Sequence, residues 1–89
     1  MLLVNKLKKF EQQIVFLKWT SASEFVKIKY VGRDFIEFDI INSDTLEYEE
    51  TILLNPDLIL EVVTSSIEIG RIIAGLSGKL EIIEYNEVN

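Results

Sequence analysis

The chain has 89 residues, 48% of them hydrophobic, and a formal net charge of −6. This length fits one domain, which we expect to span residues 1–89. The sequence lacks Cys and His, which excludes disulfides and removes the commonest general base and metal ligand, so we expect no enzyme activity and no cofactor.

The N-terminal segment predicts a short amphipathic helix followed by a strand. Leu3, Leu7 and Phe10 recur at helical spacing, and lysines lie between them, which favours a helix from about Leu2 to Glu11. The next residues, QIVFLKW, are mostly β-branched or aromatic and predict a strand from about Gln12 to Trp19. The helical spacing could also continue through this segment as one longer helix.

The segments EFVKIKYV and DFIEFDII predict a β-hairpin with one apolar face. Side chains alternate along a strand, so a turn of three residues centred on Arg33 is needed to bring the two apolar faces together. Gly32 is expected to supply the unusual backbone angles of this turn. The predicted apolar pairs are Tyr30 with Ile36, Ile28 with Phe38 and Val26 with Ile40. The predicted charged pairs on the other face are Lys29 with Glu37 and Lys27 with Asp39.

Two further strands follow, separated by polar turns. Asn42-Ser43-Asp44 marks the first turn, and Thr45–Leu54 predicts a strand whose alternation is broken at Glu50. Asn55-Pro56-Asp57 marks the second turn. The segment Leu58–Val63 is apolar at nearly every position, which is typical of a strand buried on both faces, and another subunit could cover its second face.

Residues 64–89 predict an extension made of a helix and a strand. Ser65-Ser66-Ile67-Glu68 fits a capping box. Apolar residues at helical spacing then predict a helix over about 66–77, ending near Gly78. The alternative is a hairpin that turns on Ser77-Gly78. The segment KLEIIEY predicts a final strand.

A short helix followed by five closely spaced strands resembles the Sm-like family over residues 2–63. VNKLKKFEQQIVFLKW is similar to the helix and first strand of that family, YVGRDFIEF to the link between the second and third strands, and ILLNPDLILEV to the second Sm motif. The resemblance implies a mainly β fold, a small, bent, five-stranded antiparallel barrel of the Sm-like or SH3-like type. It also implies a cyclic homo-oligomer in which the fourth strand of one subunit pairs with the fifth of the next. The expected oligomer interface is Leu53, Ile59 and Val63.

The resemblance is weaker at the positions with which family members bind RNA. Those members use an arginine-glycine-acid turn between the last two strands, whereas this chain has Asn55 and Pro56 in place of the arginine and glycine, and only Asp57 fits. The other RNA-binding loop of the family matches Gly32-Arg33-Asp34 poorly. The candidate RNA-binding residues are Lys27, Lys29, Tyr30, Arg33, Asn55 and Asp57. The simpler interpretation is that the lysines pair with acids and that Tyr30 belongs to the core.

The charges are unevenly distributed. Residues 1–33 carry seven Lys or Arg and two Glu, whereas residues 34–68 carry ten Asp or Glu and no basic residue. The densest acidic set could hold a hard cation such as Ca²⁺, although a solvated face that resists aggregation explains it better. This set is Glu37, Asp39, Glu47, Glu49 and Glu50.

The sequence therefore predicts an assembly or protein-interaction module that forms a homo-oligomer. The alternative is an RNA-binding protein that uses a basic rim, which net acidity disfavours because phosphate would be repelled. We expect no membrane partner and no small-molecule substrate, since no apolar run approaches the ~20 residues of a membrane span. The opening MLLVNKLKKF lacks the apolar region of a signal peptide, so we expect a cytoplasmic protein.

Overall fold

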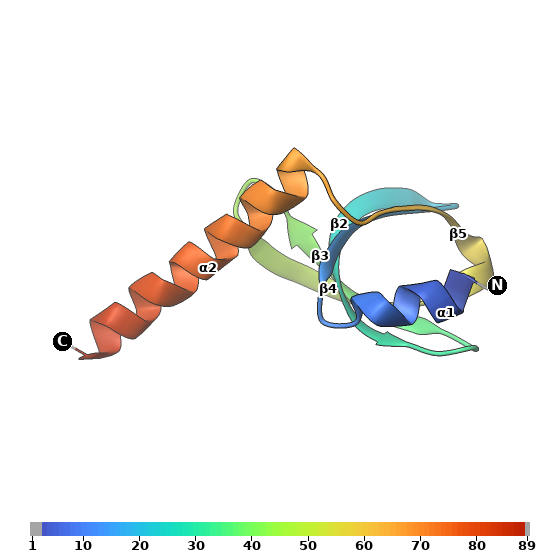
Figure 1. Cartoon of the computed structure of the whole chain (residues 1–89), viewed down its shortest axis with the longest axis horizontal. Helices are drawn as coiled ribbons and strands as arrows, with labels where there is room; N and C mark the ends of the chain where they lie inside the picture. Colours follow the sequence, from blue (N-terminus) through green and yellow to red (C-terminus); the bar gives the residue numbers. More distant parts are fainter. Residues whose placement is uncertain (1–2, 89) are drawn as a thin grey trace.

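The structure, a computed structural model, describes residues 3–88, which form one bent antiparallel sheet and two helices (Figure 1). Within the described residues the strand order is β4-β3-β2-β1-β5, and β4 and β5 are not paired with each other, so the sheet stays open. The mainly β fold, a small bent barrel, is confirmed. The strands are β1 (Ile14–Trp19), β2 (Ala22–Val31), β3 (Ile36–Asn42), β4 (Glu47–Leu54) and β5 (Ile59–Val63).

Short helical turns enter the barrel and join its last two strands. Helix α1 (Leu3–Leu7) continues into the 3₁₀ turn η1 (Lys8–Phe10), and a second 3₁₀ turn, η2 (Pro56–Leu58), links β4 to β5. The helix ends before β1 because Gln12 adopts a positive φ of 68° and its N–H donates to the carbonyl of Ile28 at 2.6 Å. The predicted N-terminal helix and first strand are therefore confirmed as separate elements.

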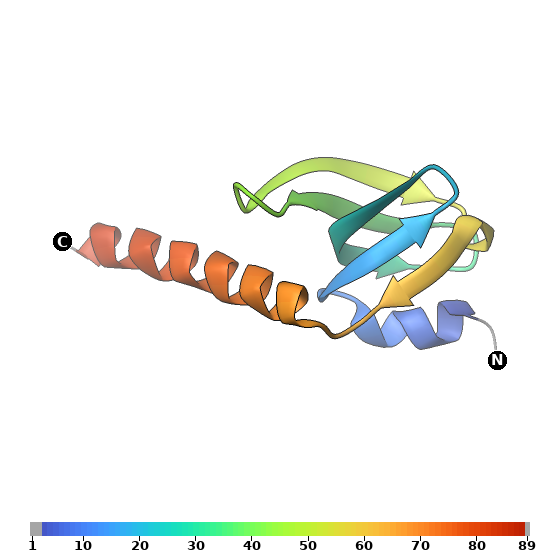
Figure 2. The same ribbon diagram turned by 90° about the horizontal axis from the view of Figure 1, so that it is seen from above.

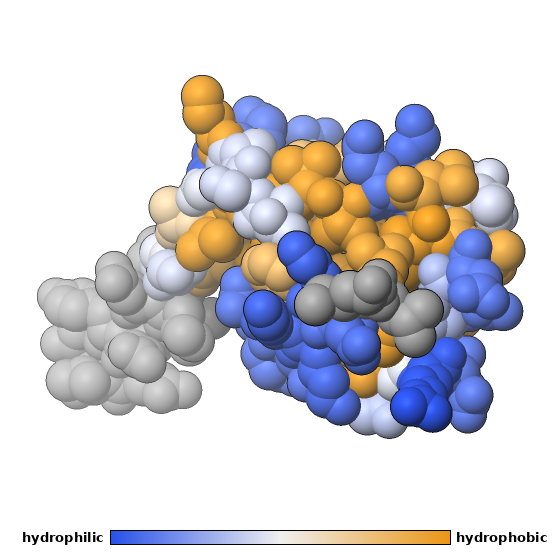
Figure 3. Space-filling view, turned by 45° about the vertical axis from the view of Figure 1, so that its right-hand side comes forward, coloured by the Kyte–Doolittle hydropathy of each residue, from blue (hydrophilic) through white to orange (hydrophobic). Residues whose placement is uncertain are grey.

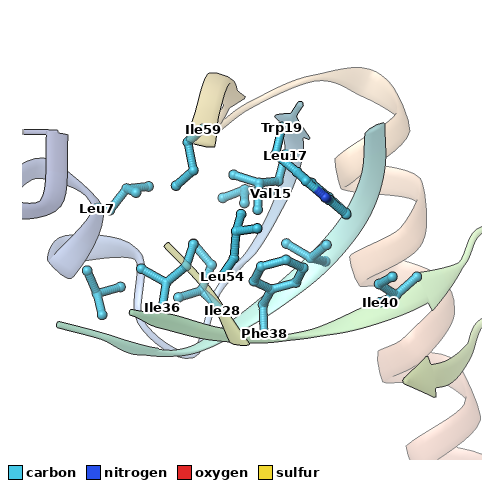
Figure 4. Packing of buried hydrophobic residues seen from close by; sticks show 12 residues of the cluster. Leu7, Val15, Leu17, Trp19, Ile28, Ile36, Phe38, Ile40, Leu54 and Ile59 are labelled. Atoms are coloured by element: carbon cyan, nitrogen blue, oxygen red, sulfur yellow. The ribbon is translucent and has the colours of Figure 1, made fainter. Parts of the chain in front are cut away.

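The core fills the concave side of the sheet and is closed by Leu7 of α1 (Figure 4). Phe38 is fully buried, and its ring lies 5.3 Å from that of Trp19 at an angle of 60°. No polar or charged residue is buried among the described residues, so apolar packing holds this interior together. The core residues are Leu7, Val15, Leu17, Trp19, Val26, Ile28, Val31, Ile36, Phe38, Ile40, Leu54 and Ile59.

The pairing of β2 with β3 agrees with the predicted register for half its length and then shifts. Val26 pairs with Ile40, Lys27 with Asp39 and Ile28 with Phe38, as predicted. After Ile28 a bulge leaves Lys29 without a ladder partner, so Tyr30 pairs with Glu37 and Val31 with Ile36. The predicted pairs Tyr30–Ile36 and Lys29–Glu37 are wrong as ladder partners. Val31 therefore enters the core, and Tyr30 turns outward with 45% of its surface exposed.

The turn between β2 and β3 also differs from the expectation. It spans four residues and is closed by the N–H of Gly32, which donates to the carbonyl of Phe35 at 3.0 Å. The expectation that Gly32 supplies unusual angles is wrong, because no described glycine has a positive φ. Gly32 instead leaves room for a neighbour: a Cβ at this position would lie 2.8 Å from the ring of Tyr30.

The C-terminal extension is one helix, α2 (Ile67–Val88), which leads away from the barrel (Figures 1 and 2). Its cap is one residue later than predicted, since the Oγ of Ser66 accepts from the N–H of Ile69 at 3.1 Å. The final strand predicted for KLEIIEY and the alternative hairpin on Ser77-Gly78 are wrong, because the helix runs through both segments. The sequence itself permits this, since Leu76, Leu80 and Ile83 continue the helical spacing.

Truncation of Phe38 tests whether this core carries the fold. We expect Phe38→Ala to cost about 3–5 kcal/mol of unfolding free energy, since it empties a buried aromatic site. The matched control is Phe35→Ala, the same truncation at a side chain that is 38% exposed, which should cost about 1 kcal/mol or less. Urea denaturation followed by circular dichroism measures both values, and equal costs would contradict the assigned faces.

Candidate functional site

The two outer strands of the sheet, β4 and β5, have backbone edges that no strand of the described chain pairs with. They lie on opposite sides of the barrel in Figure 2, β4 in yellow-green and β5 in gold. Among the described residues, β4 pairs with β3 alone and β5 with β1 alone. An unpaired edge presents free N–H and C=O groups and is a ready template for another strand.

Each of these two strands also exposes a leucine. Leu53 on β4 is 64% exposed, and Leu60 on β5 is 63% exposed. Strand β5 is not fully buried within the chain, since Leu60 and Glu61 are exposed; the expectation that another subunit covers this side of the strand stays a prediction. Hydrophobic side chains gather on the surface over β5 and the start of α2, above a hydrophilic area (Figure 3).

The three residues expected at an oligomer interface occupy different environments. Leu53 is exposed and Val63 is half-buried, whereas Ile59 belongs to the core with only 9% exposure. Ile59 is paired with Trp19 of β1 across an irregular stretch of the ladder, which turns its side chain inward and that of Leu60 outward. Leu60 is therefore the exposed hydrophobic residue of β5, and sequence reasoning missed it.

The predicted basic stretch lies along β2 and its turn. The Nζ of Lys29, displaced by the bulge, lies 3.8 Å from Glu37 and 3.7 Å from Asp39. Tyr30 packs against Phe35, with ring centroids 5.3 Å apart and the rings tilted by 43°, rather than joining the core. Lys29 thus pairs with neighbouring acids, as the simpler interpretation expects, whereas Lys27 forms no ion pair among the side chains that the structure describes.

A groove brings together two of the predicted RNA-binding residues. Arg33 from the β2–β3 turn and Asp57 from η2 line a depression of about 430 Å³, together with Pro56 and Asn5 of α1. Asn55 shapes this turn, since its Oδ1 accepts from the N–H of Asp57 at 2.9 Å. Lys27, Lys29 and Tyr30 are not among the residues that line the groove. The contribution of α1 was not foreseen, because no local pattern links residue 5 to residues 33 and 57.

The acidic set is divided between a paired part and a solvated part. Asp39 accepts a hydrogen bond from the hydroxyl of Thr51 and contacts Lys29, and Asn42 donates to Glu49 at 3.3 Å. Burial raises the pKa of Tyr48, and the negative charge of Asp39 adds to the rise. Among residues 3–78, whose side chains the structure describes, no group of three or more acids is arranged to hold a metal ion.

Comparison with protein-family models, curated proteins and solved structures finds no match to this chain. The described part of the chain has no helix with the length and apolar character needed to cross a membrane.

The titration of Tyr48 tests the electrostatics of the acidic face. Asp39→Asn should lower the pKa of Tyr48 toward its ordinary value without removing the whole rise, because burial is the larger cause. The folded state holds this proton more tightly than the unfolded state, so the associated stability is present below the ordinary tyrosine pKa. It is lost as the pH rises through the raised value. Ultraviolet absorbance of tyrosinate, assigned with Tyr48→Phe, measures the shift.

The matched control for this titration is Glu61→Gln, which removes an acid from β5 on the far side of the sheet. It should leave the pKa of Tyr48 unchanged. An equal shift in both variants would mean that Tyr48 responds to the net charge of the chain and not to Asp39.

Proposed function

We propose that this chain is an assembly and protein-interaction module of the Sm-like type, whose copies associate through the edges of their sheets. One observation carries the proposal: the two outer strands, each with one free edge, lie on opposite sides of the barrel and each present a leucine that is more than 60% exposed. Such a pair of edges suits a head-to-tail contact, which closes into a ring when the rotation between subunits allows it.

Two contributions would favour an edge-to-edge contact, namely backbone hydrogen bonds and burial of hydrophobic side chains. Joining β5 of one copy to β4 of the next would satisfy backbone groups along both strands. Burial of Leu53 and Leu60 would add about 1.5–3 kcal/mol for each fully covered side chain. The resemblance to the Sm-like family supports this pairing, because it implies the same strand partners.

No observation favours an enzyme or a resident cofactor, and the proposed role is one of binding only. A protein partner is favoured over RNA because the chain carries a net charge of −6 and Lys29 is engaged by Glu37 and Asp39. The cytoplasm remains the proposed location, which suits a chain without cysteine.

The assembly can be tested by placing a charge at each exposed leucine. We expect the wild-type chain to be a closed oligomer by light scattering after size exclusion, and Leu60→Lys or Leu53→Lys to yield folded monomers. The control is Ile73→Lys on α2, a side chain that is 46% exposed and belongs to neither edge strand, and it should not change the mass. A wild-type monomer at every concentration would refute the proposal, and dissociation by Ile73→Lys alone would move the interface to α2.

The groove supports a second candidate, RNA binding at the rim. It combines a cationic side chain, Arg33, with the amide of Asn5 and the η2 turn, a mixture that suits a phosphate beside a polar base edge. Asp57, exposed in the same groove, opposes an anionic ligand, so this candidate ranks second.

Fluorescence anisotropy with labelled single-stranded oligonucleotides tests this candidate. We expect weak binding that falls steeply with salt and falls further in Arg33→Glu. The matched control is Lys18→Glu, the same charge change on an exposed residue of β1 that does not line the groove. Sub-micromolar, salt-resistant binding that is lost only in Arg33→Glu would promote RNA to the first candidate.

A further inference from the structure

The edge strand β4 is acidic along its length. Glu47, Glu49 and Glu50 are all exposed, and the carboxylate of Glu49 accepts a hydrogen bond from the side-chain amide of Asn42. If β5 of a second copy approached this edge alone, it would add Glu61, which is also exposed. Such a contact between like charges would be unfavourable.

The surface beside β5 carries the opposite charge. Helix α1 and turn η1 expose Lys6, Lys8 and Lys9, and none of the three forms an ion pair among residues 3–78, whose side chains the structure describes. Lys6 lines a depression of about 280 Å³ together with Leu7, Phe10 and Val62 of β5. The basic segment therefore adjoins the strand whose edge is free.

These two charged surfaces lie on opposite sides of the barrel. In Figure 2, α1 (blue) and β5 (gold) run along one side, and β4 (yellow-green) along the other. A molecule with this layout cannot bring its own lysines to its own β4 glutamates. It can bring them to the glutamates of a neighbouring copy that is stacked in the same direction.

We propose that a second copy of this chain is recognised through this charge match. The basic segment Lys6–Lys9 of one copy docks beside Glu47, Glu49 and Glu50 of the next, which offsets the repulsion between β4 and β5. The inference rests on the proposed edge-to-edge assembly and specifies what directs it. It follows that the assembly weakens with rising salt, since exposed charges are screened.

Charge reversal on each surface provides the test. The first variant carries Lys6→Glu, Lys8→Glu and Lys9→Glu, and the second carries Glu47→Lys, Glu49→Lys and Glu50→Lys. Each reversal changes the charge by two, so the net charge moves from −6 to −12 in the first variant and to 0 in the second. A general charge effect would weaken the first assembly and strengthen the second, whereas the charge match weakens both.

The swapped chain that carries all six reversals has the same net charge as the wild type. We expect it to assemble with itself as the wild type does, and to exclude wild-type subunits when the two are refolded together. An equimolar mixture of the two triple variants should also assemble, because each supplies the surface that the other lacks. The readouts are mass by light scattering and subunit mixing by native mass spectrometry, with circular dichroism to establish that each variant is folded.

The possible outcomes distinguish failure of the charge match from failure of the edge-to-edge assembly on which it rests. A wild-type monomer refutes the assembly and the charge match together. If the wild type assembles and both triple variants assemble equally well at low salt, the charge match alone is refuted. The same holds if the folded swapped chain stays monomeric. Lys27→Glu on the central strand β2 is the control for reversal of a lysine outside the basic segment Lys6–Lys9, and it should leave the assembly within twofold of the wild-type dissociation constant.

Discussion

The pairing of β2 with β3 determines where the rest of the chain lies. It places Phe38 opposite Ile28 and beneath Trp19 of β1, so three neighbouring strands meet at one buried ring. The bulge at Lys29 bends β2, which lets the sheet wrap around this ring instead of lying flat. The same bend carries the β2–β3 turn toward η2, and it is this approach that forms the groove between Arg33 and Asp57.

The alternation of apolar and polar residues correctly predicted the register in the half of this hairpin where only one face is apolar. It failed where both faces offer an acceptable core residue, since Tyr30 and Val31 are each able to fill the interior and the closure of the turn at Gly32 decides between them. Strand β5 fails for the same reason: in a segment as apolar as Leu58–Val63, no polar residue marks the outer face. The ladder with β1 makes the choice, turning Ile59 inward and Leu60 outward.

Local sequence patterns could not predict the groove or the full length of the C-terminal helix, for two different reasons. Asn5, Arg33 and Asp57 are far apart in sequence, and only the path of the backbone brings them to one depression. The segment KLEIIEY fits both a period of two and a period of 3.6. Helix α2 packs against β1 and buries Ile69 and Ile72, so it is well anchored before that segment begins, and a helix already formed extends more easily than a new strand finds an edge.

The negative charge of the glutamates on β4 affects in two ways which strands can pair with its free edge. A free edge of this kind invites pairing with any extended chain, and three glutamates make it a poor template for neutral or acidic strands. The same glutamates leave one class of partner acceptable, a strand accompanied by cations, and β5 with α1 beside it meets that condition. If both charges lay on one side of the barrel, two copies would pair face to face and the association would stop at a dimer. Because they lie on opposite sides (Figure 2), each contact leaves an identical pair of surfaces open, and only the closure of a ring removes them.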